Sequence, residues 1–269
     1  MRFLGGGMKK IVMKFGGAAL KTPKHIMEIA EIIIERSLHF DHIVIVVSAM
    51  GKMTDELQSL AYQISSSPSK REQDMLLSVG ERISMALLSM ALSEKKREAI
   101  SLTGSQSGII TSSHYGDAKI IAVKPSRIVE YLNQGKIVIV AGFQGVSEEK
   151  EITTIGRGGS DTTAVALGIA LQAEKVEFYK DVQGVYSEDP KKKPGLLPFS
   201  QLTFKEALDL AHQNSFILHP RSIFLASKNG LPLHVVSFKK EERDLFAGTW
   251  ILDDKILRSC IPIYEDKTE

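Results

Sequence analysis

A glycine-rich segment with the sequence TIGRGGSD, at residues 154–161, runs directly into a stretch of small and apolar residues with helical character. Free N–H groups and about half a positive charge at the start of a helix form an anion site. Arg157 adds a planar guanidinium suited to a carboxylate or a phosphate. Asp161 can either cap the helix or orient a cation-bearing group at a reacting centre. The segment therefore predicts a site for an anionic ligand.

A second candidate site, KFGG at residues 14–17, ends the first predicted strand. Gly16 and Gly17 allow a tight turn that presents N–H groups to an anion, and the ammonium of Lys14 can meet phosphate charge. By itself the motif is equally well interpreted as a turn beside a solvated lysine. It is neither a GxxxxGK[ST] loop nor a GxGxxG fingerprint, which disfavours the familiar nucleotide loops and a dehydrogenase.

Three polar residues lie near other predicted strand ends and helices. The hydroxyls of Ser48 and Thr54 either form a turn and a helix N-cap or face a ligand. Glu81 follows Gly80 inside an apolar helix, where glycine costs about 1 kcal/mol relative to alanine, so we expect another element to pack closely there. The Glu81 carboxylate could bind an ammonium through bonds of roughly 1.5–3 kcal/mol each. A surface pair with Arg82 is the alternative.

The loop at residues 179–191 carries side chains that suit a nucleotide. Tyr186 could stack on a base, Lys191 could meet a phosphate, and Asp181 could accept a hydrogen bond from a ribose or a base amine. Each of these residues alone is ordinary loop chemistry. Together they predict one half of a nucleotide site.

Alternating strands and helices must position these residues. Apolar runs predict strands at 11–15, 43–47, 99–103, 137–141, 176–179 and 233–236, and three-to-four spacing predicts helices at 25–37, 54–65, 71–92, 125–134, 161–171, 204–212 and 221–228. The strand runs are continuous rather than alternating, as in parallel sheets covered on both faces. We expect an α/β fold, a three-layer α/β/α sandwich with a mainly parallel central sheet and ligands at the carboxyl ends of its strands. A break near Lys175 separates two halves without a linker.

The composition limits the classes of partner and the cellular compartment that we expect for the protein. The 269 residues include 34 Lys+Arg and 32 Asp+Glu, a net charge of +2. Because the basic residues are scattered, we expect no nucleic-acid partner. We also expect no membrane partner: the N-terminal MRFLGGGM lacks a signal-peptide core, and no apolar run approaches ~18 residues. A single cysteine, Cys260, excludes an internal disulfide and a cysteine zinc site and fits a reducing, cytoplasmic location.

In chain order, the motifs KFGG, VVSAMGKMTDEL, SVGERIS, GFQGV, TTIGRGGSDTTAVALG, KDVQGVYSEDP and ILHPRSI resemble the catalytic domain of aspartate kinases, within the amino-acid kinase superfamily. The resemblance extends from about Lys10 to Thr249. It implies the amino-acid kinase fold and transfer of the γ-phosphoryl group from Mg-ATP to the side-chain carboxylate of L-aspartate. The product would be 4-phospho-L-aspartate, which leads to lysine, threonine, methionine and diaminopimelate.

The resemblance also implies roles for individual residues. Glu81 matches the group that reads the substrate amino group, and Arg157 matches the one that holds a substrate carboxylate. The full set comprises catalytic Lys14 and Asp161; substrate-binding Ser48, Thr54, Glu81 and Arg157; and ATP-binding Lys14, Gly16, Gly17, Lys180, Asp181, Tyr186 and Lys191. The implied cofactors are ATP and Mg²⁺, with no metal site made by the protein alone. We expect L-aspartate and ATP as small-molecule partners and a homo-oligomer.

Three departures from the family pattern keep alternatives open. Ala18 and Ala19 replace two hydroxyl residues, and Phe216 replaces a lysine that touches ATP. The family usually continues into ACT domains that bind feedback amino acids. We divide the chain into an extension at 1–9, a catalytic domain at 10–252 and a tail at 253–269 in which an ACT domain could begin. The alternatives are a related kinase acting on another carboxylate or a carbamate, or a non-catalytic nucleotide- or amino-acid-binding module.

Overall fold

An eight-stranded sheet forms the centre of the molecule. The computed structural model describes residues 8–213, 218–253 and 261–266, so Phe216 and Cys260 lie outside the described residues. The sheet has the order β10-β12-β11-β9-β1-β2-β6-β3, and all its neighbours are parallel except β11 and β12. Its strands are β1 (Lys10–Phe15), β2 (His42–Val47), β3 (Ala99–Leu102), β6 (Ile137–Ala141), β9 (Lys175–Lys180), β10 (Gln201–Leu202), β11 (Leu233–Ser237) and β12 (Thr249–Ile251). The predicted mainly parallel sheet is confirmed.

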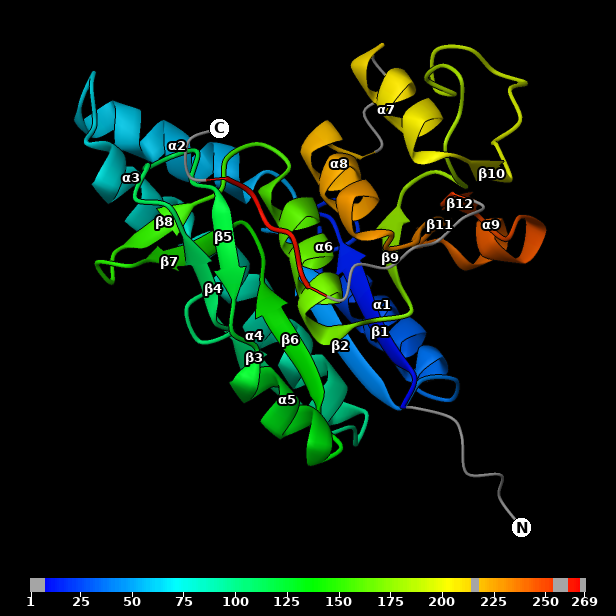
Figure 1. Ribbon diagram of the computed structural model, residues 1–269, viewed down its shortest axis with the longest axis horizontal. Coiled ribbons are helices and arrows are strands. Elements are labelled where there is room, and N and C mark those ends of the chain that lie inside the picture. The colour runs from blue at the N-terminus through cyan, green and yellow to red at the C-terminus, as the bar shows by residue number, and fades with distance from the viewer. Residues whose placement is uncertain (1–7, 214–217, 254–260, 267–269) are drawn as a thin grey trace.

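Helices cover both faces of this sheet, which completes the predicted three-layer sandwich (Figure 1). The described helices are α1 (Pro23–Arg36), α2 (Met53–Ile64), α3 (Lys70–Leu77), α4 (Val79–Glu94), α5 (Ser126–Asn133), α6 (Gly159–Leu171), α7 (Phe204–His212), α8 (Pro220–Asn229) and α9 (Lys240–Leu245). The helices α1 and α4 pack on one face, and α5, α6, α7 and α8 supply the other. The helix predicted at 71–92 is two helices that meet at Ser78, whose carbonyl accepts a hydrogen bond from the Gln144 side chain at 2.7 Å.

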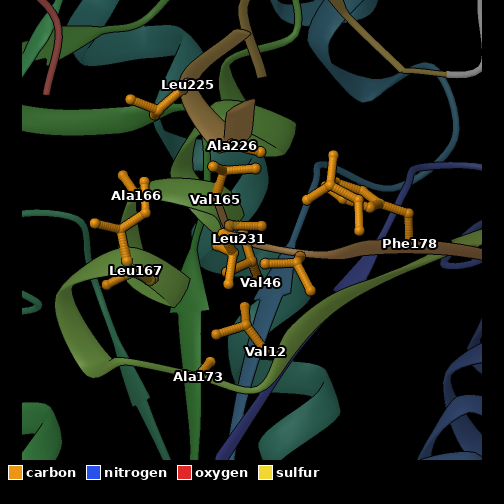
Figure 2. Packing of buried hydrophobic residues seen from close by; sticks show 14 of the residues in the cluster. Val12, Val46, Val165, Ala166, Leu167, Ala173, Phe178, Leu225, Ala226 and Leu231 are labelled. Carbon is orange, nitrogen blue, oxygen red and sulfur yellow. The ribbon is translucent and has the colours of Figure 1, made fainter. Parts of the chain in front are cut away.

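The alternation of side chains along β1 assigns each residue to a layer. Met13 and Phe15 belong to the apolar cluster with α1 and α4, whereas Val12 belongs to the cluster with α6 and α8. Figure 2 shows Val12 and Val46 beneath residues of α6 and α8. Lys14 follows Val12 by two positions, and successive side chains of a strand alternate between its faces. Lys14 therefore lies on the α6 side of the sheet.

A second, smaller sheet was not predicted from the sequence. Its strands β4 (Ile109–Thr111), β5 (Ile120–Val123), β7 (Gln144–Ser147) and β8 (Ile152–Thr154) have the order β5-β4-β7-β8. They lie with α2 and α3 beyond the carboxyl ends of β2 and β6 (Figure 1). The predicted break near Lys175 falls at the start of β9, and β9 pairs directly with β1 within the main sheet.

Within the described part of the chain, one helical stretch, Lys70–Glu94, is long and apolar enough to cross a membrane by length and composition alone. It consists of α3 and α4, and α4 buries Met85, Leu88 and Leu92 against the sheet. A core helix covering a sheet satisfies the same criteria, so the stretch is weak evidence for a membrane span.

Candidate active site

A cavity of about 760 Å³ opens at the carboxyl ends of β1 and β2 and at the start of α6. Ligands bind at this edge in open α/β sheets, where loops and helix N-termini converge. The small sheet and the helices α2 and α3 contribute the outer wall. The cavity brings together the sequence-predicted residues Lys14, Gly17, Ser48, Thr54, Glu81, Arg157 and Asp161.

Two lysines share one buried carboxylate at the inner end of the cavity. Lys14 Nζ lies 2.6 Å from Asp161 Oδ1, and Lys180 Nζ lies 3.4 Å from Asp161 Oδ2. The three side chains come from β1, the first turn of α6 and the end of β9. Two ammonium groups and one carboxylate leave one net positive charge beside a helix N-terminus, which favours an anion at this position.

Burial and neighbouring charges shift the pKa values of Asp161 and Lys180. Burial raises the pKa of Asp161, but the charges of Lys14 and Lys180 outweigh it and hold that pKa below its usual range. Desolvation lowers the pKa of Lys180 below its usual range, and the positive charge of Lys14 adds to that effect. The Asp161 carboxylate is therefore ionised at neutral pH and keeps both ammonium groups in place.

Glu81 is the second buried acidic residue of the cavity. The residue is 3% exposed, and its Oε1 accepts a hydrogen bond from the Ala49 backbone N–H at 3.0 Å. Its Oε2 is buried and has no hydrogen-bond partner among the described residues. Burial raises the pKa of Glu81 to about 7. A buried oxygen without a donor is costly, so this position favours a cationic ligand group.

Gly80 explains how Glu81 reaches the cavity. A Cβ at Gly80 would lie 2.7 Å from the Cβ of Ala49. The glycine therefore allows α4 to approach the segment after β2, as the sequence predicts. Glu81 belongs to this packed interface and not to a surface pair with Arg82.

The glycine-rich segment enters α6 through a left-handed residue. Gly158 is the N-cap of α6 with φ of 70°, and a Cβ there would lie 2.3 Å from the His219 side chain. Only glycine fits such a position without strain and clash. Asp161 lies in the first turn and not at the cap, so the capping alternative for this residue is wrong. Arg157 is exposed at the cavity wall.

The two hydroxyl residues both line the cavity. Ser48 follows β2, and its backbone N–H donates to the Phe15 carbonyl at 3.1 Å. Thr54 is the second residue of α2, whose N-cap is Lys52, without a side-chain hydrogen bond. The predicted N-cap role of Thr54 is therefore wrong, and its hydroxyl remains available to a ligand.

The predicted nucleotide loop lies next to the cavity and does not line it. Asp181 and Lys191 form an exposed ion pair with 2.6 Å between Oδ2 and Nζ. Tyr186 is buried, and its hydroxyl lies 3.3 Å from Gln183 Oε1. Lys180 connects this loop to the inner end of the cavity through Asp161.

Two of the residues that depart from the family pattern, Ala18 and Ala19, do not line the cavity. Ala19 is buried in the apolar cluster with α1 and α4, and Ala18 is also absent from the wall. By contrast, Gly16 lies close to the Lys14 ammonium, because a Cβ there would be 3.5 Å from Lys14 Nζ.

Asp74 is a cavity residue that the sequence did not reveal. Its Oδ2 accepts from the backbone N–H groups of Gly116 at 3.0 Å and Thr154 at 2.8 Å, and its Oδ1 accepts from the Thr154 hydroxyl at 2.7 Å. The side chain thereby ties α3 to both loops of the outer wall. In the sequence it is one acidic residue before an apolar run, without spacing that relates it to either loop.

Comparisons with known proteins identify the fold and its relatives. A sequence model described as the amino acid kinase family matches residues 9–237. The aspartokinase of Geobacillus stearothermophilus is 50% identical over 244 residues, which cover 91% of this chain and 59% of that protein. Aspartokinase 2 of Bacillus subtilis is 47% identical over 247 residues, covering 92% of this chain and 60% of that protein. The chain thus spans about three fifths of the length of these curated relatives.

Solved structures agree on the architecture. The aspartate kinase from Synechocystis aligns with a TM-score of 0.81 and 42% identity, over 93% of this chain and 40% of that one. Aspartokinase III of Escherichia coli, solved in complex with aspartate and ADP, aligns with a TM-score of 0.79 and 24% identity, over 92% of this chain and 65% of that one. The second likeness supports the fold alone.

Proposed function

The chain belongs to the amino acid kinase family, and from that premise we propose that it is the catalytic domain of an aspartate kinase. In this reaction the side-chain carboxylate of L-aspartate attacks the γ-phosphorus of ATP. The bond from that phosphorus to the bridging oxygen breaks, which gives 4-phospho-L-aspartate and ADP. The relatives named aspartokinase, at 47–50% identity over most of the chain, support this assignment.

One observation carries the proposal: a single cavity contains groups for both ends of an amino-acid substrate and for phosphate. Glu81 offers an unpartnered carboxylate oxygen that suits an ammonium, and Arg157 offers a fork that suits a carboxylate. Lys14 and Asp161 of the cavity wall, together with Lys180 bonded to Asp161 from outside it, provide the net positive charge that suits a phosphoryl group. This combination matches an α-amino acid with a second carboxylate better than it matches a carbamate.

The reaction needs little help with proton transfer. A carboxylate is already ionised at neutral pH, so the nucleophile requires no strong base. Catalysis then consists of holding the carboxylate and the phosphoryl group in line and neutralising charge on the phosphate oxygens. We assign the neutralisation to Lys14 and Lys180, and the fixing of both ammonium groups to Asp161. Ser48 and Thr54 would contact the acceptor.

Mg²⁺ accompanies ATP in the proposed reaction and neutralises phosphate charge. Among the described residues, no group of three or more His, Cys, Asp or Glu side chains could hold a metal by itself. This composition fits Mg²⁺, which is usually held by one or two carboxylates together with substrate phosphates. Asp161 is the buried carboxylate at the proposed phosphate end, and it is the residue that would face the ion.

The loop at 179–191 is proposed to hold the nucleotide. Its exposed Asp181–Lys191 pair can exchange partners with ribose and phosphate groups at small cost, because exposed pairs contribute only about 0–1 kcal/mol. Tyr186 and the two glycines after β1 complete the proposed ATP site.

By analogy with the relatives, we further propose that residues 10–252 form the kinase domain and that the protein is cytoplasmic. We also propose a homo-oligomer, and sedimentation at several concentrations would test that oligomeric state.

Formation of aspartyl hydroxamate tests the proposed function directly. The purified chain is incubated with ATP, Mg²⁺, L-aspartate and hydroxylamine, and the expected result is hydroxamate formed in proportion to ADP. N-acetyl-L-aspartate is the matched control acceptor, because it keeps both carboxylates and lacks the ammonium that Glu81 is proposed to bind.

Two other outcomes would replace the proposal. Turnover with L-glutamate, carbamate or N-acetyl-L-aspartate, but not with aspartate, would indicate a related kinase of different specificity. A rise in melting temperature with ATP or aspartate, with ADP formation at background, would indicate a binding module without catalytic activity.

A further inference from the structure

Arg221 of α8 lies behind the outer wall of the cavity and bonds to two of its loops. Its Nη1 donates to the Ile155 carbonyl at 2.5 Å and lies 3.4 Å from Asp117 Oδ1. Its Nη2 donates to the Ala118 carbonyl at 2.6 Å. The side chain is 13% exposed, so these contacts are made largely away from water. The residues that Arg221 contacts are therefore close neighbours of Gly156 and Arg157 on one loop and of Gly116 on the other.

A short segment near the end of the chain holds Arg221 in this position. Residues 261–266 run beside β5 and α8 (Figure 1), and both carboxylate oxygens of Glu265 bond to the Arg221 guanidinium. Glu265 is also bonded to β5, since its Oε2 accepts from the Ile120 N–H at 2.7 Å and its own N–H donates to the Ile120 carbonyl at 3.1 Å.

Asp74 holds the same two loops from the opposite side. It accepts hydrogen bonds from the backbone N–H groups of Gly116 and Thr154. These two residues immediately precede Asp117 and Ile155, which Arg221 contacts. The loops are also bonded to each other, through the Ala118 N–H and the Thr154 carbonyl at 2.9 Å. The position of the segment carrying Arg157 thus depends on an acidic group in the cavity and a basic group behind it.

We propose that Arg221 is a positioning residue for the acceptor site, and that Glu265 couples residues 261–266 to the loop carrying Arg157. The proposal rests on the proposed role of this loop in binding the carboxylate of aspartate. Arg221 does not line the cavity described above and touches no reacting group. It acts by fixing two carbonyls, which fixes the direction in which Arg157 enters the cavity.

The chemistry requires an arginine at this position. A guanidinium presents five donors in a rigid plane, so it can satisfy a carboxylate and two carbonyls at once. A lysine keeps the charge, but its single ammonium cannot reach the same set of acceptors. The replacement Arg221→Lys should therefore resemble removal of Glu265 and should not preserve the wild-type behaviour.

Steady-state kinetics test the coupling. Glu265→Ala and Arg221→Lys should each raise KM for aspartate about tenfold, with kcat and KM for ATP within about twofold of wild type, because they disturb positioning and not the phosphate end. In the double variant the losses should not add, since both changes remove the same arrangement. Unchanged KM in both single variants, or strictly additive losses, would overturn the proposal.

Asn229→Ala is the matched control. Asn229 bonds twice to Ile263 of the same segment, at 2.9 Å through its side-chain nitrogen and 2.9 Å through its oxygen, but it contacts neither cavity loop. It should lower the melting temperature and leave KM for aspartate within about twofold. A KM increase equal to that of Glu265→Ala would show that general loosening, and not the Arg221 contact, is responsible.

A measurement without turnover separates this proposal from the proposed function. Amide hydrogen exchange at residues 116–118 and 154–158 should accelerate about tenfold in Glu265→Ala and not in Asn229→Ala. If the wild-type chain forms no aspartyl hydroxamate, the kinase proposal fails, yet the exchange experiment still decides whether Arg221 and Glu265 fix these loops. Unchanged exchange would overturn the positioning role regardless of the reaction.

Discussion

Two clusters of buried charge, one between β9 and α1 and the other at the carboxyl ends of the main sheet's strands, differ in how completely their carboxylates are bonded. The sheet cluster surrounds Glu177 of β9, which is fully buried. Its Oε1 lies 2.6 Å from Arg36 and 2.8 Å from Lys175, and its Oε2 accepts from the Tyr179 hydroxyl at 2.8 Å. His234 is a further neighbour, with Nδ1 at 3.5 Å.

The pocket cluster comprises Lys14, Asp161, Lys180 and Glu81, and it leaves bonding capacity unused. Glu81 has one buried oxygen without a partner among the described residues, and burial raises its pKa to about 7. In the sheet cluster, burial also raises the pKa of Glu177, but His234, Lys175 and Arg36 outweigh it and bring that pKa to about 2. Buried charge that is fully bonded stabilises the fold, whereas incompletely bonded charge marks a ligand site.

The largest expected effect comes from removing a lysine of the pocket cluster. Lys14→Ala should lower turnover about 10²–10³-fold, by analogy with the loss of one preorganised donor to developing charge. Hydroxamate formation at saturating substrates measures it. Lys175→Ala is the matched control from the sheet cluster and should change stability while turnover stays within about twofold. Near-unchanged turnover in Lys14→Ala would refute the proposed catalytic role of Lys14.

Glu177→Gln should give the largest change in stability. The substitution leaves the partly exposed charges of Arg36 and Lys175 without their buried acidic partner, which costs roughly 3 kcal/mol, the low end for a broken buried pair, or about 10² in the folding equilibrium. Urea unfolding at neutral pH measures the loss. The kcat of the folded fraction should stay close to wild type. A variant with unchanged stability and reduced kcat would reverse the comparison between the clusters.

Glu81→Gln should have a smaller effect, and one of opposite sign on stability. Loss of the carboxylate should raise KM for aspartate about tenfold, the value of one charge-assisted hydrogen bond. The melting temperature at pH 8 should rise, because the substitution removes a buried charge with an unpartnered oxygen. Asp55→Asn, which removes an exposed carboxylate from the same cavity wall, is the control and should leave both values near wild type.

The pH dependence of stability also separates the two glutamates, because they predict opposite slopes. Because the folded pKa of Glu81 is raised to about 7, its protonation makes folding more favourable as pH falls through 7 toward 4.5. The folded pKa of Glu177 is lowered to about 2, so its stabilisation is present above 4.5 and is lost as pH falls toward 2. Urea unfolding of wild type, Glu81→Gln and Glu177→Gln across pH 3–8 separates these slopes.

The pH dependence of activity should reflect the pocket cluster and not the sheet cluster. If binding of the substrate ammonium requires ionised Glu81, kcat/KM for aspartate should fall about tenfold between pH 8 and pH 6. The Glu81→Gln variant should lack this dependence. A wild-type profile that is flat across this range would contradict the assignment of Glu81 to the ammonium.

The sequence predicted those parts of the fold that depend on local patterns. Continuous apolar runs located β1, β2 and β6, and glycine-rich segments located the turns that face the cavity, because both signals are contained within a few residues. The small sheet was missed because its strands have only three or four residues. Such short runs carry too little periodicity to separate a strand from a loop.

Site residues were predictable where a charged side chain stands beside a glycine that signals an unusual local backbone. Lys14, Glu81 and Asp161 each stand beside a glycine-rich turn or an unexpected glycine, and the cavity contains all three. Asp74 and Arg221 were missed because their partners lie 42 to 104 positions away along the chain. Nothing in a run of acidic, basic and apolar residues indicates which distant carbonyl or N–H a side chain will meet.

The position of β1 within the sheet has a consequence during synthesis of the chain. Ile11 pairs with Ile43 on one side and with Lys175 on the other, and the latter is 164 positions later. At a synthesis rate of about 5–20 residues per second, one edge of β1 remains unpaired for roughly 8–33 s before β9 has been synthesised. During that interval an apolar strand edge is available to other chains. A nascent chain would therefore gain from a chaperone that covers β1. Lys14 and Lys180 come together at Asp161 only after β9 has been synthesised.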